Sequence, residues 1–280
     1  MDAETALPTC YRHPDRETRI ACSSCERPIC VECMNSASVG QKCPECAAPV
    51  GRSKVIHARD LQRNGWRLAP FSYTVVGICV VLAVLAFVVP GIMEPVYLAL
   101  WQDNAAVGQG DVWRLLTATL VHSPGSIWHV GFNMYALTIF GPPLERDVGT
   151  VPFAALYVAC ALAGGAAFFV ASPTAGVAVG ASGAIFGLFG AWLAASLRTR
   201  HTLQGSANLR QLMVLLAINL ALPLLIPRIA WEAHLGGLVA GFLILIVWSR
   251  LSADGQALAV RRAMIAVAVG AISVLAVLLR

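Results

Sequence analysis

Residues 180–183 read Gly-Ala-Ser-Gly and residues 233–237 read Ala-His-Leu-Gly-Gly, and each stretch lies in an apolar segment. A lone serine in a membrane helix usually bonds its own backbone, and a lone histidine near the membrane interface is often an anchor. Here Ser182 and His234 are both flanked by glycines, which allow their helices to touch. We therefore interpret the two stretches as a hydroxyl nucleophile and its base, held in adjacent membrane helices.

The composition is that of a polytopic membrane protein. Of the 280 residues, 58% are hydrophobic and 12% are charged, with a mean hydropathy of +0.70, whereas soluble domains carry about 25% charged residues. Residues 1–70 hold ten Lys or Arg and eight Asp or Glu, and the rest of the chain holds ten and seven. We expect a soluble head and a membrane body, without a cleavable signal because Asp2 and Glu4 interrupt the N-terminus. The modest net charge of +5 gives no indication of nucleic-acid binding.

Seven apolar stretches have about the length that a bilayer requires, roughly 17 to 25 residues. They cover residues 71–89, 126–143, 150–171, 181–197, 209–226, 230–249 and 262–279. Basic residues gather in alternate loops, on the same side as the basic juxtamembrane linker at 49–70. By the positive-inside rule this side is cytoplasmic. We expect an integral, multi-pass protein of a bacterial plasma membrane, with its N-terminus in the cytoplasm and its C-terminus outside.

The long connection from Gly91 to Gly125 contains too many polar residues to span the bilayer and too many large apolar residues to be fully exposed to water. Trp101, Trp113 and Arg114 stand there among several leucines. Tryptophan rings prefer the membrane interface. We expect a structured loop that lies in the interface on the outer side.

Seven of the nine cysteines lie in the first 46 residues. With one histidine they form four pairs of the C-x2-C type: Cys10 with His13, Cys22 with Cys25, Cys30 with Cys33, and Cys43 with Cys46. Eight such ligands suit two tetrahedral zinc ions. A disulfide framework is the alternative, but the cysteines are odd in number and the cytosol is reducing. Cys79 and Cys160 fall in apolar segments and are interpreted as core residues.

The short gap between Cys25 and Cys30 favours an interleaved arrangement of these pairs. One site would contain Cys10, His13, Cys30 and Cys33, and the other Cys22, Cys25, Cys43 and Cys46. The order of spacings resembles a B-box zinc finger over about residues 8–48. Because all eight positions are filled, both zinc ions should be structural, and none should serve catalysis. The resemblance implies protein binding or self-association through a domain at residues 1–48.

The second apolar stretch places His129 and Asn133 four residues apart, on one helix face. Taken alone, such a pair most often forms a hydrogen bond between helices. Both side chains can also donate to an oxyanion that develops during acyl transfer. Together with Ser182 and His234 they indicate an acyl-transfer site. Gly180 allows a sharp turn before the serine, and Gly183 begins a small-xxx-small motif after it.

These residues resemble the rhomboid family of intramembrane serine proteases over about residues 71–250. The matching motifs are Trp113-Arg114, His129-x3-Asn133, Gly141-x2-Leu144-Glu145, Gly180-x-Ser182-Gly183 and Ala233-His234-x2-Gly237-x3-Gly241. The resemblance implies an all-α polytopic membrane protein with a rhomboid-like core of six helices. Residues 251–280 would then add a loop and a seventh transmembrane helix.

The resemblance also implies roles for single residues. Ser182 would be the nucleophile and His234 the base, without a third acidic member, and the oxyanion would be received by Asn133, His129 and the Ser182 backbone N–H. Phe186 would pack on the imidazole, where many relatives carry tyrosine. The implied substrates are transmembrane proteins, cut near the outer end of a locally unstable helix.

Other functions fit the sequence less well. Gly108-Gln109-Gly110-Asp111 matches the GxGD signature of aspartyl proteases, but it lies outside the spans and has no second aspartate. The spacing of Glu232 and His234 excludes the His-Glu-x2-His motif of a zinc protease. A transporter would use intramembrane histidines, but no span carries a deep carboxylate. An inactive rhomboid-like protein that only binds membrane helices is the remaining alternative.

Overall fold

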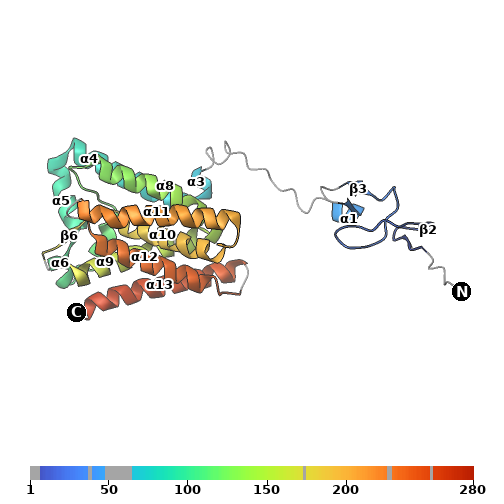
Figure 1. Cartoon of the computed structure of the whole chain (residues 1–280). Helices are drawn as coiled ribbons and strands as arrows, with labels where there is room; N and C mark the ends of the chain where they lie inside the picture. The colour runs from blue at the N-terminus through green and yellow to red at the C-terminus, as the bar shows by residue number, and fades with distance from the viewer. Residues whose placement is uncertain (1–6, 37–39, 48–64, 173–174, 226–228, 253–254) are drawn as a thin grey trace. The chain divides into compact units, whose positions relative to one another are not determined.

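The computed structural model describes residues 7–36, 40–47, 65–172, 175–225, 229–252 and 255–280. The chain divides into two compact units, Met1–Ala58 and Arg59–Arg280, and each is considered by itself (Figure 1). Most of the predicted basic linker, residues 49–64, lies outside the described residues. Its last part forms the short helix α3, Gly65–Leu68.

The head unit consists of short strands and turns around its cysteines. Strand β1 (Thr9–Cys10) pairs antiparallel with β2 (His13–Glu17), β3 (Asn35–Ser36) pairs with β4 (Gln41–Lys42), and helix α1 (Pro44–Ala47) follows. The buried core holds five cysteines and Ile29, which is 0% exposed. A core of this size supplies little folding free energy by itself.

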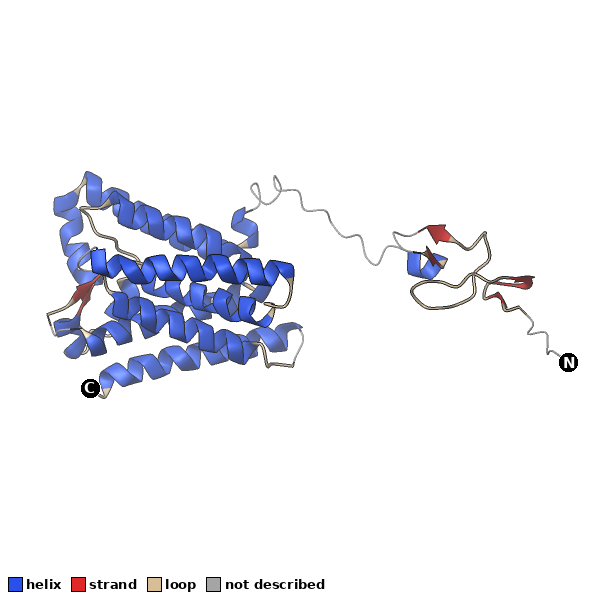
Figure 2. Cartoon of the chain, viewed as in Figure 1, coloured by secondary structure: helices blue, strands red, loops and turns tan. Residues whose placement is uncertain are grey.

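Long helices make up the membrane unit (Figure 2). In the described residues they are α4 (Pro70–Val88), α8 (Ile127–Val148), α9 (Thr150–Ala171), α10 (Ser182–Arg198), α11 (Leu203–Leu225), α12 (Trp231–Trp248) and α13 (Gly255–Leu278). Each falls on one of the seven predicted spans, and the predicted fold class, an all-α polytopic membrane protein, is confirmed. Helix α4 begins with Pro70. Proline has no backbone N–H, but the first N–H groups of a helix have no partner inside the helix, so proline is favoured at this position.

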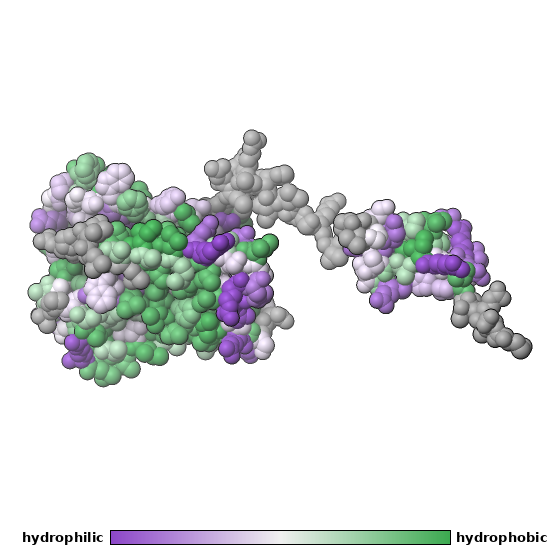
Figure 3. Space-filling view, in the orientation of Figure 1, coloured by the Kyte–Doolittle hydropathy of each residue, from purple (hydrophilic) through white to green (hydrophobic). Residues whose placement is uncertain are grey.

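The surface of these helices suits a bilayer. Helices α4, α9, α12 and α13 are long and apolar enough to cross a membrane, and α10 is apolar but shorter. In Figure 3 hydrophobic residues cover the middle of the visible face of this unit, and hydrophilic residues gather toward the helix ends. The chain is thus an integral, multi-pass membrane protein. The crossing of the bilayer by α8, α10 and α11 stays a prediction.

Helix α10 lies among α8, α9, α11 and α12 and has its most extensive contact with α12. Glycines make this contact close. A Cβ at Gly237 would collide with the Gly183 carbonyl, and a Cβ at Gly241 would collide with the Gly187 carbonyl. The close approach predicted from the small-xxx-small spacing is therefore confirmed.

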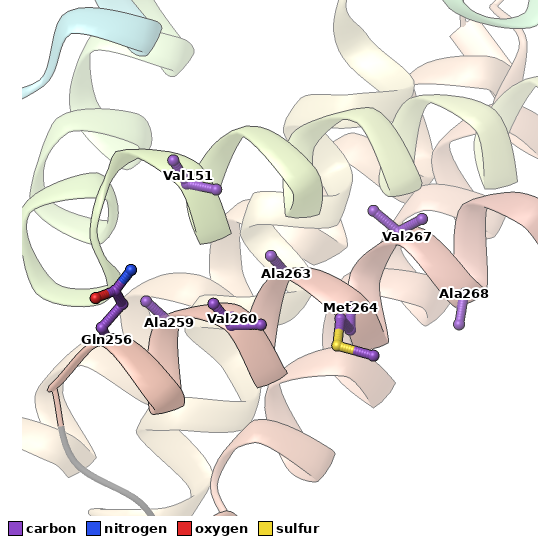
Figure 4. Close-up of a pocket in the computed structure, with 8 residues that line it drawn as sticks. All are labelled: Val151, Gln256, Ala259, Val260, Ala263, Met264, Val267 and Ala268. Atoms are coloured by element: carbon purple, nitrogen blue, oxygen red, sulfur yellow. The ribbon is translucent and has the colours of Figure 1, made fainter.

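The seventh long helix, α13, packs along α9, where Gly270 lies against Ala159. Near the other end of α13, Val277 joins an apolar cluster with Leu115. Beside the first turns of α13 the two helices leave an apolar groove (Figure 4), lined by Val151, Gln256, Ala259, Val260, Ala263, Met264, Val267 and Ala268. Apart from Gln256 these side chains are apolar, as suits a surface in contact with lipid.

The connection between α4 and α8 is structured, as predicted. It contains α5 (Pro90–Leu100), strand β5 (Gln102–Asp103), α6 (Asn104–Gly108) and α7 (Arg114–Thr117). Strand β5 pairs with β6 (Val177–Ala178), just before α10, a contact that the sequence did not predict. The Arg114 guanidinium donates to the Leu98 and Trp101 carbonyls and to the Asp111 carboxylate, so Arg114 holds this connection together.

Glu145, near the end of α8, forms hydrogen bonds with the N-terminus of α4. It is 1% exposed, and its carboxylate accepts from the Phe71 N–H at 2.9 Å, the Ser72 N–H at 2.9 Å and the Ser72 hydroxyl at 2.7 Å. The Thr150 hydroxyl donates to it as well, at 3.0 Å. Because no side chain at Ala69 caps α4, Glu145 caps it from another helix.

We predict that Glu145→Ala lowers the free energy of unfolding by about 3 kcal/mol, because it leaves buried donors of α4 without an acceptor. Unfolding in mixed detergent micelles measures the change. Asp147→Ala, two residues further on and exposed, is the control and should change it by less than about 0.5 kcal/mol. Equal effects of the two substitutions would contradict the capping role.

Candidate active site and metal clusters

The segment before α10 has a conformation that only glycine adopts readily. Gly180 has a φ of +115°, in the region that side chains disfavour. A Cβ at this position would lie 2.8 Å from His129 Nε2. The Gly180 N–H donates to the Ala118 carbonyl at 2.9 Å, which fastens the segment to the loop after α7. Ser182 follows as the first residue of α10.

Ser182 and His234 are in contact. The Ser182 Oγ and the His234 Nε2 lie 2.9 Å apart, although 52 residues separate them in sequence. Gly183 lies against the Ala233 carbonyl, because a Cβ at Gly183 would be 3.4 Å from that oxygen. With the proton of the neutral imidazole on Nδ1, the serine hydroxyl donates to Nε2.

An aromatic ring supports the imidazole. The rings of Phe186 and His234 are stacked, with centroids 4.2 Å apart and planes 5° from parallel. Glu232, two residues before His234, accepts instead from the Ser172 hydroxyl at 3.0 Å. The contacts that orient the imidazole are thus those with Phe186 and Ser182.

The two predicted oxyanion residues differ in what they contact. The Asn133 amide donates to the His129 carbonyl at 2.8 Å, which leaves its second N–H for another acceptor. The Ser123 N–H donates to His129 Nδ1 at 3.2 Å, so the ring proton is on Nε2, the atom that faces Gly180. The first hydrogen bond of α10 runs from Ile185 N–H to the Ala181 carbonyl and leaves the Ser182 N–H without a partner inside the helix.

His122 was missed by the sequence reasoning, although the structure brings it to the same place. It is 1% exposed, and its ring lies edge-on to that of His129, with centroids 5.2 Å apart. The available signal was a histidine directly after the apolar residues Leu120 and Val121. No spacing rule joins His122 to His129 or Ser182, so the sequence alone did not single it out.

The eight ligand candidates of the head form two groups. Cys10, His13, Cys30 and Cys33 make up one, and Cys22, Cys25, Cys43 and Cys46 make up the other; within each group the ligand atoms lie within 4.8 Å of one another. The structure groups the eight residues into the two interleaved sets expected from their spacing, and both clusters could hold a metal ion; the binding of zinc stays a prediction.

Backbone N–H groups donate hydrogen bonds to two sulfurs of the second group. The Cys43 N–H donates to Cys22 Sγ at 3.2 Å, and the Cys46 N–H donates to Cys43 Sγ at 3.4 Å. The first of these bonds is the main cause that lowers the pKa of Cys22 to about 6. Because metals bind the thiolate, a lowered pKa favours binding at neutral pH.

Comparison with known proteins finds similarity to rhomboid proteins. The Rhomboid domain matches residues 109–251. A putative rhomboid protease of Bacillus subtilis, YdcA, is 37% identical over 150 residues, which are 52% of this chain and 74% of that protein. The rhomboid protease GluP of the same organism is 37% identical over 141 residues, 50% of this chain and 27% of GluP. RHOMBOID-like protein 1 of Arabidopsis thaliana is 40% identical over 143 residues, 50% of this chain and 36% of that protein.

The match to the Rhomboid domain covers about half of the chain and spans α8 to α12. The chain belongs to the rhomboid family of intramembrane serine proteases. The matched residues include Ser182 and His234, whereas the cysteine-rich head lies outside the match.

Proposed function

We propose that this rhomboid-family chain cleaves transmembrane segments of membrane proteins, with Ser182 as nucleophile and His234 as general base. The observation that carries the proposal is the 2.9 Å contact between their side chains, with the imidazole stacked on Phe186. A hydroxyl and a base within hydrogen-bond distance, the base held by a third group, form the arrangement that acyl transfer requires.

The proposed reaction has two steps. His234 takes the Ser182 proton as the oxygen attacks a substrate carbonyl, and the same proton then passes to the leaving amine. The oxyanion is received by the Ser182 N–H, the Nε2–H of His129 and the second N–H of Asn133. Water, activated by His234, then hydrolyses the acyl-enzyme and restores the serine.

The substrates are transmembrane proteins whose helix is locally unstable near the outer face of the membrane. A peptide bond inside a helix is hydrogen-bonded and shielded, so helix-breaking residues are needed to expose it to Ser182. The alternation of basic loops supports an N-terminus in the cytoplasm and a dyad near the outer face, at the opposite helix ends.

The head binds two zinc ions, one in each cluster, and serves regulation or partner binding on the cytoplasmic side. Clusters of four sulfurs, or of three sulfurs and one imidazole, are typical of closed structural zinc sites. Metal binding then provides the folding free energy that the small core lacks.

We predict that Ser182→Ala abolishes labelling by a fluorophosphonate and lowers cleavage of a model transmembrane substrate by at least about 10³-fold. Purified protein in detergent serves for both assays. Ser273→Ala on α13, where the hydroxyl bonds only its own helix, should leave both unchanged. If the wild-type chain neither labels nor cleaves, the inactive binder or the transporter becomes the better interpretation.

Gly180→Ala should lower kcat by about 10²-fold, because the added Cβ displaces His129 or the segment that carries the serine. Turnover of the same substrate measures the change. Gly77→Ala on α4 is the matched control, since a Cβ there has nothing within 4 Å. Wild-type turnover in Gly180→Ala would contradict the proposed location of the oxyanion hole.

Metal analysis of the reduced protein should give two zinc ions per chain. Zinc binds deprotonated sulfurs, and the N–H of Cys43 lowers the pKa of the Cys22 thiol, which favours retention of zinc at neutral pH. As the pH falls, protons compete for the sulfurs and zinc is released. A zinc content near zero at neutral pH would refute the assignment. Fluorophosphonate labelling should persist after chelation, because the dyad contains no metal ligand.

A further inference from the structure

His122 is a buried imidazole with no part in the proposed Ser182–His234 chemistry. It lies between α7 and α8 and is 1% exposed. Burying a polar ring costs free energy unless it is hydrogen-bonded. The partners of this ring therefore indicate what it does.

The most informative partner belongs to the nucleophile segment. The N–H of Ala181, the residue immediately before Ser182, donates to His122 Nε2 at 3.3 Å. An imidazole can accept here only when it is neutral and its proton is on Nδ1. The ring also lies edge-on to His129, with a ring angle of 68°, and thus contacts both sides of the oxyanion hole.

Two further bonds leave from the same stretch of chain. The Ala118 carbonyl accepts from the Gly180 N–H at 2.9 Å, and the Ser123 N–H donates to His129 Nδ1 at 3.2 Å. Consecutive N–H groups of the nucleophile segment are therefore held by residues 118–122, while the next residue sets the tautomer of His129. Residues 118–123 join the two halves of the oxyanion hole.

We propose that His122 is a positioning residue of the oxyanion hole, which holds the Gly180–Ala181 peptide and the His129 ring at a fixed separation. The proposal rests on the proposed function of Ser182 and His129. His122 does not touch the substrate. Its Nε2 fixes the peptide before Ser182, and thereby the direction of the Ser182 N–H that receives the oxyanion.

The test compares His122→Leu with His122→Gln in the full-length protein. Leucine fills the buried space but accepts no hydrogen bond, whereas the glutamine Oε1 can stand near the place of Nε2. Loss of a positioning bond should lower kcat about 10- to 100-fold in His122→Leu, with KM within about 2-fold of wild type. His122→Gln should recover kcat to within about 5-fold of wild type. His201→Leu, an exposed histidine after α10, is the control and should behave as wild type.

Two results would overturn the proposal: a wild-type kcat in His122→Leu, or a kcat in His122→Gln no higher than in His122→Leu. If wild type is active and Ser182→Ala is not, either result counts against His122 alone; activity in Ser182→Ala would refute the proposed function itself. If His122→Leu fails to fold, the tautomer of His122 in the wild-type protein tests the proposal instead. Nitrogen chemical shifts of histidine-labelled protein report this tautomer. A His122 proton on Nδ1 supports the proposal, and one on Nε2 overturns it.

Discussion

The contact between α10 and α12 is the constraint on which the membrane unit depends. The carbonyls of Gly183 and Gly187 occupy the space that side chains at Gly237 and Gly241 would need, so the helices can approach this closely only where a hydrogen atom replaces a side chain. In a bilayer, apolar side chains gain little by leaving lipid, and close packing of this kind is what holds helices together. The Ser182–His234 contact lies at one end of this interface and follows from it.

Helix α9 packs against both helices of this interface. Gly164 of α9 lies against the Ala233 carbonyl, next to His234, and Gly187 of α10 lies against Cys160. Cys160 is 0% exposed, which confirms its interpretation as a core residue. The proposed base and nucleophile therefore lie on closely packed helices, whereas the proposed oxyanion residues depend also on the loop from Ala118 to Ser123. In such a site, hydrogen bonds from the loop are needed to fix the position of the oxyanion residues relative to Ser182 and His234.

The two units of the chain are stabilised by different physical means. In the membrane unit, hydrogen bonds between separate elements satisfy some of the buried polar groups, and the Glu145 carboxylate, which binds the N-terminus of α4, is the clearest case. In the head, the core is a set of cysteines whose sulfurs accept backbone N–H bonds and gather into two clusters. If these clusters hold zinc, as proposed, folding of the head and metal binding are one process.

The sequence by itself determined the elements and the chemistry that each carries. Hydropathy located the long helices to within a few residues, except that α8 runs on to Val148, α11 begins at Leu203 and α13 begins at Gly255, because short-range hydrogen bonding extends helices past their apolar part. Spacing paired the cysteines, and glycine patterns indicated that α10 and α12 meet. Only the tertiary structure decided the partners of buried polar groups: Glu145 with the start of α4, β5 with β6, and His122 with Ala181. Such contacts join residues far apart in sequence through a few hydrogen bonds, which leave no periodic pattern, whereas helices and ligand pairs are local and repeat along the chain.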